Sequence, residues 1–256
     1  MRFGRRTAVV IAVAAASALA VVGVAMAATR STAVFNFSPD KVPKKTYKPG
    51  KLFVHTHTNY SSTSSKTQRA QLYFDDDFKI RTRGIPQCNK SKISGTVTMQ
   101  AAMAACGRAK VGSGKAQAAA GSNTVNACVL AFNGKPSNGK PTLLLFTRAN
   151  VAPPFTINCS SPSTNTQGNT NVLLVGLYKG ATGDFGTQLD IDHIDSASAL
   201  PLTDFRTTIK RGRYVSARCH DKNRTWNMKT KFTYLSPSGT QTVNSSETCR
   251  VQRKRR

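Results

Sequence analysis

Short segments in which apolar and polar residues alternate recur along most of this chain, and they constrain its fold more than any other feature. The clearest is TWNMKTKFTY at 225–234, where every second side chain from Trp226 to Tyr234 falls on one face of an extended strand. We expect that face, with Trp226, to lie in the core. Similar segments lie at 33–37, 51–60, 70–80, 123–132, 141–148, 172–178, 186–194, 202–209, 213–219 and 240–251. Turn residues separate them at intervals of about 8 to 12 residues, which predicts a mostly β fold, an antiparallel β-sandwich of about ten strands.

One stretch favours a helix instead. Residues 97–105 are mostly good helix formers, and the preceding Ser94, Gly95 and Thr96 offer a polar N-cap. Gly107 is suited to the left-handed position that follows a helix end. The sequence therefore predicts one short α-helix in an otherwise β-rich chain.

The segments 123–132 and 141–148 predict a β-hairpin. They are joined by NGKPSNGK, which contains two Asn-Gly pairs, and Asn-Gly is typical of tight turns between antiparallel strands. The nearby KVGSGKA at 110–116 lacks the spacing of a phosphate-binding loop, so we expect its glycines to mark a tight turn or a bulge. A long loop rich in Asn, Ser and Thr is expected at 151–171.

The cysteines predict a disulfide-stapled domain. Their number is even, which favours disulfides in an oxidising compartment. We expect neighbours along the sequence to pair: Cys88 with Cys106, Cys128 with Cys159, and Cys219 with Cys249. No two cysteines have the C-x-x-C spacing of a zinc site, so zinc is not expected.

Residues 1–27 have the pattern of a secretory signal peptide. An arginine-rich start precedes an apolar run at 8–24, and the small-x-small triplet Ala-Met-Ala follows at 25–27. The alternative is an uncleaved N-terminal anchor, since the apolar run approaches the length of a membrane span. We expect residues 28–256 to form a single β-sandwich domain with a basic C-terminal tail, exported to the cell envelope or the extracellular medium.

The charge balance favours a polyanionic partner. The chain has 37 basic and 11 acidic residues, a formal net charge of +26. Such an excess suits nucleic acid, an anionic wall polymer or a membrane surface, although basic residues spread along a chain also serve solubility. The one dense cluster is the tail, Arg253, Lys254, Arg255 and Arg256. We expect this tail to contact an anionic cell-wall polymer or another polyanion.

Two histidines are weak candidates for metal ligands. His55 and His57 alternate in the segment KLFVHTHTNY, so a strand places both on one face. His-x-His on a strand can bind a metal, but the site needs a third ligand, and the other histidines are His193 and His220. Exposed strand histidines without a metal are the alternative interpretation.

Three consecutive aspartates, Asp75, Asp76 and Asp77, are weak candidates for a calcium site. Carboxylates with neighbouring carbonyls can hold calcium, but consecutive acids lack the alternate spacing of an EF-hand loop. The alternative is a solvated turn whose charge is neutralised by the basic residues that follow it, Lys79 and Arg81 among them. Apart from calcium, no cofactor is expected.

A second pair of carboxylates raises the possibility of an enzyme. Asp190 and Asp192 alternate with apolar residues, so a strand places both on one exposed face. Paired carboxylates can perform acid and base catalysis on a sugar, whereas two acids on an exposed face are usually only a polar surface. The chain contains no G-x-S-x-G nucleophile motif.

A set of short stretches links the chain to a known group. They are YFDDDFKI, GIPQC, ACGRAKVGSGKA, GKPTLLLFTR, YVSARC, TWNMKTKFTY and SETC. Through them residues 52–249 resemble a group of uncharacterised secreted proteins of actinobacterial, high-GC Gram-positive type. The resemblance implies an envelope or extracellular setting and a single domain. It implies no activity, ligand or catalytic residue.

Taken together, these features favour a secreted or envelope-associated protein that binds an anionic polymer or surface without catalysing a reaction. One alternative is a carbohydrate-active or calcium-dependent extracellular enzyme built around the aspartate clusters. The other is a passive structural or assembly module. A polyanion binder is expected to lose affinity steeply with salt, whereas an enzyme is expected to lose activity on a single Asp→Asn change.

Overall fold

The computed structural model describes residues 29–61, 65–95, 98–150, 155, 157–159, 168–180, 183–194, 200–220, 224–235 and 239–252. The predicted signal peptide at 1–27 and the tail Arg253, Lys254, Arg255 and Arg256 lie outside this part of the chain. The strands are β1 (Arg30–Ser38), β2 (Lys41–Val42), β3 (Lys48–Pro49), β4 (Lys51–Asn59), β5 (Thr67–Asp75), β6 (Phe78–Ile80), β7 (Lys110–Ala120), β8 (Asn123–Ser137), β9 (Lys140–Ala149), β10 (Asn169–Lys179), β11 (Phe185–Ile191), β12 (Leu202–Ile209), β13 (Val215–Ala217), β14 (Thr225–Tyr234), β15 (Thr240–Thr248) and β16 (Arg250–Val251). The helices are η1 (Lys90–Lys92), α1 (Met99–Cys106) and η2 (Gly107–Ala109).

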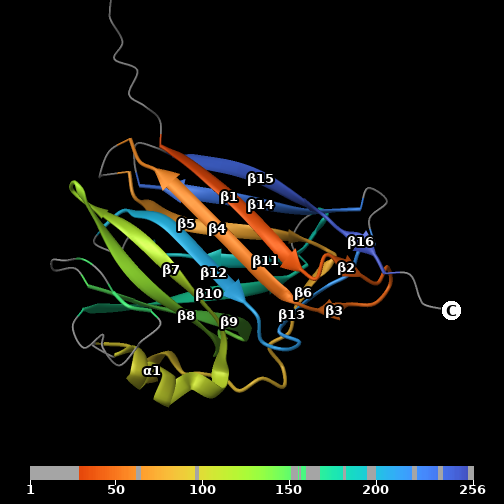
Figure 1. Cartoon of the computed structure of the whole chain (residues 1–256), viewed down its shortest axis with the longest axis horizontal. Helices are drawn as coiled ribbons and strands as arrows, with labels where there is room; N and C mark the ends of the chain where they lie inside the picture. Colours follow the sequence, from red (N-terminus) through yellow and green to blue (C-terminus); the bar gives the residue numbers. More distant parts are fainter. Residues whose placement is uncertain are drawn as a thin grey trace, which may run out of the picture.

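Eleven of the strands form one antiparallel sheet, in the order β1-β4-β12-β7-β8-β9-β10-β11-β5-β14-β15 (Figure 1). The sheet curls until its two edge strands, β1 and β15, lie side by side. Side chains join these edges: Gln241 accepts a hydrogen bond from the Ser31 N–H at 2.7 Å, and Glu247 accepts one from the Phe37 N–H at 2.7 Å. The predicted mostly β, antiparallel fold is confirmed. The two layers expected of a sandwich are two halves of one sheet that folds over on itself. Within the described residues no helix is long and apolar enough to cross a membrane.

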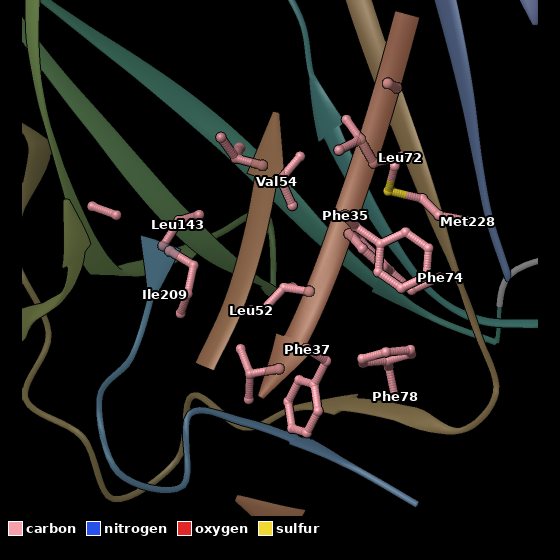
Figure 2. Packing of buried hydrophobic residues seen from close by; sticks show 14 of the residues in the cluster. Phe35, Phe37, Leu52, Val54, Leu72, Phe74, Phe78, Leu143, Ile209 and Met228 are labelled. Atoms are coloured by element: carbon pink, nitrogen blue, oxygen red, sulfur yellow. The ribbon is translucent and has the colours of Figure 1, made fainter. Parts of the chain in front are cut away.

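The main core fills the inside of the curled sheet, and aromatic rings fill one end of it. Phe37, Phe78 and Trp226 meet edge to face, with ring centroids 5.3 to 5.5 Å apart. Figure 2 shows Phe37 and Phe78 at one end of this core, with Leu52 and Phe74 next to them and Leu143 further away. Trp226 is fully buried, as its strand pattern predicts.

A second, smaller core lies outside the sheet, under α1. In β9, Leu143 and Leu145 point into the main core, while Leu144 and Phe146 point outward and pack with the helix residue Met99. Because both faces of this strand are covered, its sequence is a continuous apolar run without the usual alternation.

The predicted helix is present, but its caps differ from the prediction. Thr98 is the N-cap, and its side chain accepts a hydrogen bond from the Ala101 N–H at 3.0 Å; the predicted caps Ser94 and Gly95 lie further back along the chain. Gly107 has φ of −56°, in the right-handed region, so the left-handed ending is wrong. The chain continues there into η2 because the backbone keeps a helical turn.

All three predicted disulfides are present: Cys88–Cys106, Cys128–Cys159 and Cys219–Cys249. The first and second hold the outer core together, and the third joins the end of the main sheet to the segment after β13. For the second and third bridges, pairing of sequence neighbours follows from the antiparallel hairpins β8–β9 and β14–β15. Cys88 and Cys106 instead bracket the segment that contains η1 and α1.

The predicted hairpin is confirmed, with its turn at the second of the two Asn-Gly pairs. Asn138 and Gly139 both have positive φ, 49° and 71°, as a tight two-residue hairpin turn requires. The first pair, Asn133-Gly134, lies within β8, at a register irregularity between Gly134 and Ser137.

Candidate functional site

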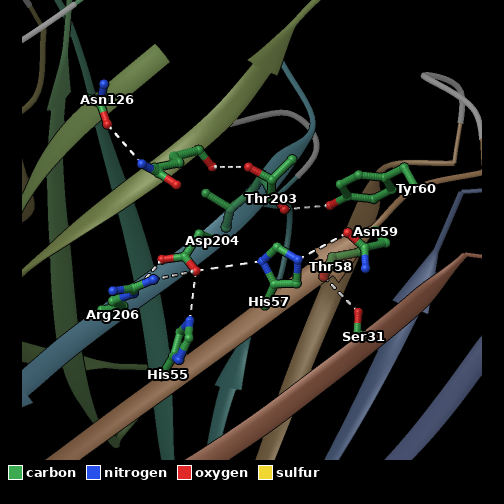
Figure 3. A network of polar contacts seen from close by, with 12 residues as sticks. Ser31, His55, His57, Thr58, Asn59, Tyr60, Asn126, Thr203, Asp204 and Arg206 are labelled. Carbon is green, nitrogen blue, oxygen red and sulfur yellow. Dashed lines mark hydrogen bonds and ion pairs between the residues drawn. The ribbon is translucent and has the colours of Figure 1, made fainter. Parts of the chain in front are cut away.

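The outer face of β4 carries the two histidines, as their alternation predicts. The next strand in the sheet, β12, places Asp204 directly opposite His57 and Arg206 directly opposite His55. All four side chains lie on the outside of the sheet (Figure 3). The structure therefore supplies an aspartate and an arginine as the neighbours of the histidines, and neither His193 nor His220 completes a metal site with them.

Asp204 is the centre of this cluster. Its Oδ2 lies 2.7 Å from His55 Nε2 and 3.6 Å from His57 Nδ1, and its Oδ1 accepts a hydrogen bond from Arg206 Nε at 2.8 Å. The Asp204 side chain is 8% exposed, so these contacts replace most of its hydration. One carboxylate thus contacts a guanidinium group and two imidazole rings.

Asp204 is held in its charged form. Burial alone would raise the pKa of the Asp204 carboxyl, but the hydrogen bonds and charges of His55 and Arg206 outweigh it and lower that pKa below its ordinary value. The carboxylate is therefore ionised at neutral pH and acts as an acceptor that orients the two histidine rings.

The row of basic residues continues onto β7. Lys115 lies directly opposite Arg206 across the β7–β12 pairing, and both side chains are exposed on the outer face. None of the ion pairs among the described residues involves Lys115. We call His55, Arg206 and Lys115 the cationic row, because they face one another on three adjacent strands.

The glycines of KVGSGKA make this row possible. They lie in β7, with a register irregularity between Lys110 and Gly112, so the predicted bulge is present and the alternative of a tight turn is wrong. A Cβ atom on Gly114 would lie 1.9 Å from the carbonyl oxygen of Arg206. Glycine therefore allows β7 to approach β12 at the point where Lys115 meets Arg206.

A polar hollow of about 380 Å³ adjoins the cationic row. It is lined by side chains of β7, β8 and β12 and by the segment that the Cys128–Cys159 bridge holds against the sheet; the residues are Lys115, Ala116, Gln117, Asn126, Ala127, Ile157, Cys159, Asp204 and Arg206. Gln117 donates a hydrogen bond to the Asn126 side chain at 3.0 Å across its floor. The hollow offers amide groups and cations to a ligand, which suits an anion.

The three aspartates of the predicted calcium site lie at the turn between β5 and β6. Asp75, Asp76 and Asp77 are the one group of acidic, histidine or cysteine side chains in the described residues whose ligand atoms lie close enough to share a metal ion. Protein donors already occupy most of these oxygens. Asp77 accepts hydrogen bonds from Arg218 Nε and the His220 N–H, each at 2.7 Å, and Arg218 Nη2 donates to Asp76 at 2.9 Å.

Arg218 is therefore the main partner of the aspartate turn, in place of the basic residues that follow it in sequence. Of those, Lys79 lies over the ring of Tyr47, 4.0 Å from its centroid. The Asp77 side chain is 1% exposed and that of Arg218 is 21% exposed. A buried carboxylate of this kind needs a paired cation, so the ion pair explains the cluster without a bound metal.

Asp75 gives the turn a measurable pH dependence. Burial raises the pKa of the Asp75 carboxyl to about 6, and the carboxyls of Asp76 and Asp77 add to the rise, while the Asp77 N–H opposes it. The folded state therefore binds this proton more tightly than the unfolded state, whose pKa is near 3.8. We expect the free energy of unfolding to fall, through this group, as pH rises from about 4 to about 6.

An NMR titration of the Asp75 side-chain carboxyl carbon checks this expectation. The midpoint is expected near pH 6 and is expected to stay there when calcium chloride is added. A midpoint near the ordinary aspartate value contradicts the burial argument. A midpoint that calcium lowers shows instead that the turn binds the ion, because a cation favours the ionised carboxylate.

The predicted catalytic pair, Asp190 and Asp192, does not form. Asp190 is 8% exposed and pairs with Arg69, whose Nε donates to Oδ1 at 2.7 Å while Nη2 contacts Oδ2. Asp192 lies beyond the end of β11, is half exposed and accepts a hydrogen bond from the His193 N–H. The strand ends between the two acids, so they do not share the exposed face that the alternation predicts, and Asp190 has no free oxygen for general acid or base catalysis.

Comparison with known proteins adds no relative from which a role could be transferred. No family model, no curated protein and no solved structure matches the chain. The functional interpretation therefore rests on the geometry of the cationic row and its hollow.

Proposed function

We propose that this protein is an exported binding protein for an anionic polymer, and that the cationic row of His55, Arg206 and Lys115 is its main binding surface. The observation that carries the proposal is the direct cross-strand pairing of Arg206 with Lys115. Like charges directly opposite each other on a sheet are destabilising. Such a pairing is favourable when an anion occupies the site and neutralises both groups.

The surroundings of the row support the same interpretation. Asp204 is the acidic neighbour that the structure gives it, and this carboxylate is already shared between His55, His57 and Arg206. The polar hollow beside Lys115 is also lined by the amide side chains of Gln117 and Asn126. With a formal net charge of +26 on the whole chain, the long-range field also attracts polyanions to the surface.

The setting of the protein is part of the proposal. Three disulfides suit an oxidising compartment, and the signal-like pattern at 1–27 supports export. The resemblance to secreted proteins of actinobacterial type favours an envelope or extracellular setting, where an anionic cell-wall polymer is the polyanion at hand. The tail Arg253, Lys254, Arg255 and Arg256 supplies a second cationic segment for the same polymer.

Retention on isolated Gram-positive cell walls tests the proposal. We expect the Lys115→Gln/Arg206→Gln variant to bind about fivefold more weakly than the wild type, because two exposed ion contacts contribute about 1 kcal/mol together. The matched control is Lys92→Gln/Lys231→Gln, which removes the same charge from exposed positions away from the row. Equal retention of the two double variants contradicts the assignment of the site, since net charge alone would then account for binding.

A further inference from the structure

The inside of the curled sheet is filled at one end and hollow at the other. Aromatic rings pack the end near Phe37 and Trp226. At the opposite end, beside the β7–β8 hairpin, the inward-facing side chains are mostly aliphatic and keep part of their surface accessible. Leu173, Leu189, Ile191, Leu202 and Phe205 are all packed against the core yet only half-buried.

Two adjoining cavities account for this accessible surface. One of about 80 Å³ lies in the middle of the sheet, and one of about 130 Å³ lies towards the β7–β8 hairpin. Both are lined by Leu173, Ile194, Leu202 and Phe205, so the two cavities adjoin at these four side chains. Neither lining contains a charged residue.

Three of the threonines that line the inner cavity already have hydrogen-bond partners. Thr58 shares a hydrogen bond with the Ser31 hydroxyl at 2.6 Å, and Thr67 shares one with the Tyr60 hydroxyl at 2.9 Å. Thr207 donates to the Ser113 carbonyl at 3.5 Å. Water in this space would find few partners, and a roomy apolar cavity of about 150 Å³ is known to stay dry and to accept a molecule such as benzene.

We infer that this cavity is a binding site for a small uncharged hydrocarbon group, a single aromatic ring or a short alkyl chain. The size of the space and its uncharged, mostly aliphatic lining select such a ligand, and the accessible surface at the β7–β8 end gives the entry route. The site lies on the inner face of the sheet, whereas the cationic row lies on the outer face. Hydrocarbon binding does not use the cationic row, because His55, Arg206 and Lys115 line neither cavity.

Toluene is the probe for the test, with the whole exported chain and methyl-labelled leucine and isoleucine. We expect toluene to shift the NMR methyl signals of Leu173, Leu202 and Ile194 and to leave Leu130 and Leu144, in the outer core under α1, unshifted. At a tenfold excess over its Kd, toluene is expected to raise the Tm by about 3–6 °C.

Two matched variants separate the cavity from the surface. Leu173→Trp fills the space from inside, and Leu174→Trp places the same ring on the outer face, where Leu174 is 36% exposed. Toluene binding is expected to disappear in the first variant and to persist in the second. The inference is overturned if toluene shifts no methyl signal in the wild type, or if it shifts the signals of both cores equally. This test uses the wild type alone, so it does not depend on whether either variant folds.

Discussion

Replacement of Arg218 by alanine is expected to lower the free energy of unfolding by about 3–5 kcal/mol, because it leaves the buried carboxylate of Asp77 without its cation. Arg218 donates to Asp77 at 2.7 Å and to Asp76 at 2.9 Å, and Asp77 is almost completely buried. The guanidinium also lies over the Tyr47 ring, 5.1 Å from its centroid. Urea unfolding followed by tryptophan fluorescence measures the loss, since Trp226 lies fully buried beside this turn.

Arg206→Ala is the matched control for that change. Arg206 also pairs with an aspartate, Asp204, but the Arg206 side chain is 56% exposed. When Arg206 is replaced, Asp204 still has His55 and His57 as neighbours. Its loss is expected to cost less than about 1 kcal/mol. Equal destabilisation by the two alanine substitutions contradicts the role given to Arg218. Partial recovery of stability in Arg218→Ala/Asp77→Asn is expected, because that double variant buries no unpaired charge at position 77.

Removal of the Cys219–Cys249 bridge is the other large effect. The bridge joins residues 30 apart in sequence, and in the chain-entropy model opening such a loop costs about 4 kcal/mol. Both cysteines are fully buried in the main core, so the substitutions also leave a small void there. We expect Cys219→Ala/Cys249→Ala to lower the free energy of unfolding by about 3–5 kcal/mol.

Urea unfolding of this double variant in non-reducing buffer checks the expectation, because the other two bridges stay intact there. The slope of the transition with urea is expected to increase, since the unfolded chain without the bridge exposes more surface. A decrease in the free energy of unfolding below about 1 kcal/mol contradicts the stabilising role given to the bridge, because the denatured chain would then gain no conformational freedom when this loop is opened.

Local pattern predicted the elements of this fold, whereas long-range register determined the candidate site. Alternation placed His55 and His57 on one face of their strand, and the same argument applied to LTDFRTTI places Asp204 and Arg206 on one face of theirs. The local sequence pattern of each strand does not show that the two strands are neighbours in the sheet. His55 and Asp204 are 149 residues apart, and their contact follows from the sheet order.

Two further differences between the sequence predictions and the structure also arise from contacts between residues far apart in the sequence. The strand β7 was not predicted because KVGSGKAQAAA contains few β-branched or aromatic residues, and its pairing with β8 and β12 overrides that weak propensity. The aspartate turn was expected to be neutralised by nearby Lys79, but its partner Arg218 comes from a segment 141 residues away from Asp77. The pairings Cys128–Cys159 and Cys219–Cys249 were predictable because β8 and β9, and β14 and β15, are consecutive antiparallel neighbours in the sheet.

The most direct test of the proposed polyanion binding is the salt dependence of affinity for a defined polymer. Binding of residues 28–256 to sodium polyphosphate is measured by titration calorimetry over a series of sodium chloride concentrations. We expect log K to fall linearly with log salt, and the slope of Lys115→Gln/Arg206→Gln to be smaller by about 2 than that of Lys92→Gln/Lys231→Gln. Identical slopes for the two variants, or an affinity that salt does not change, contradict the assignment of the cationic row as the binding surface.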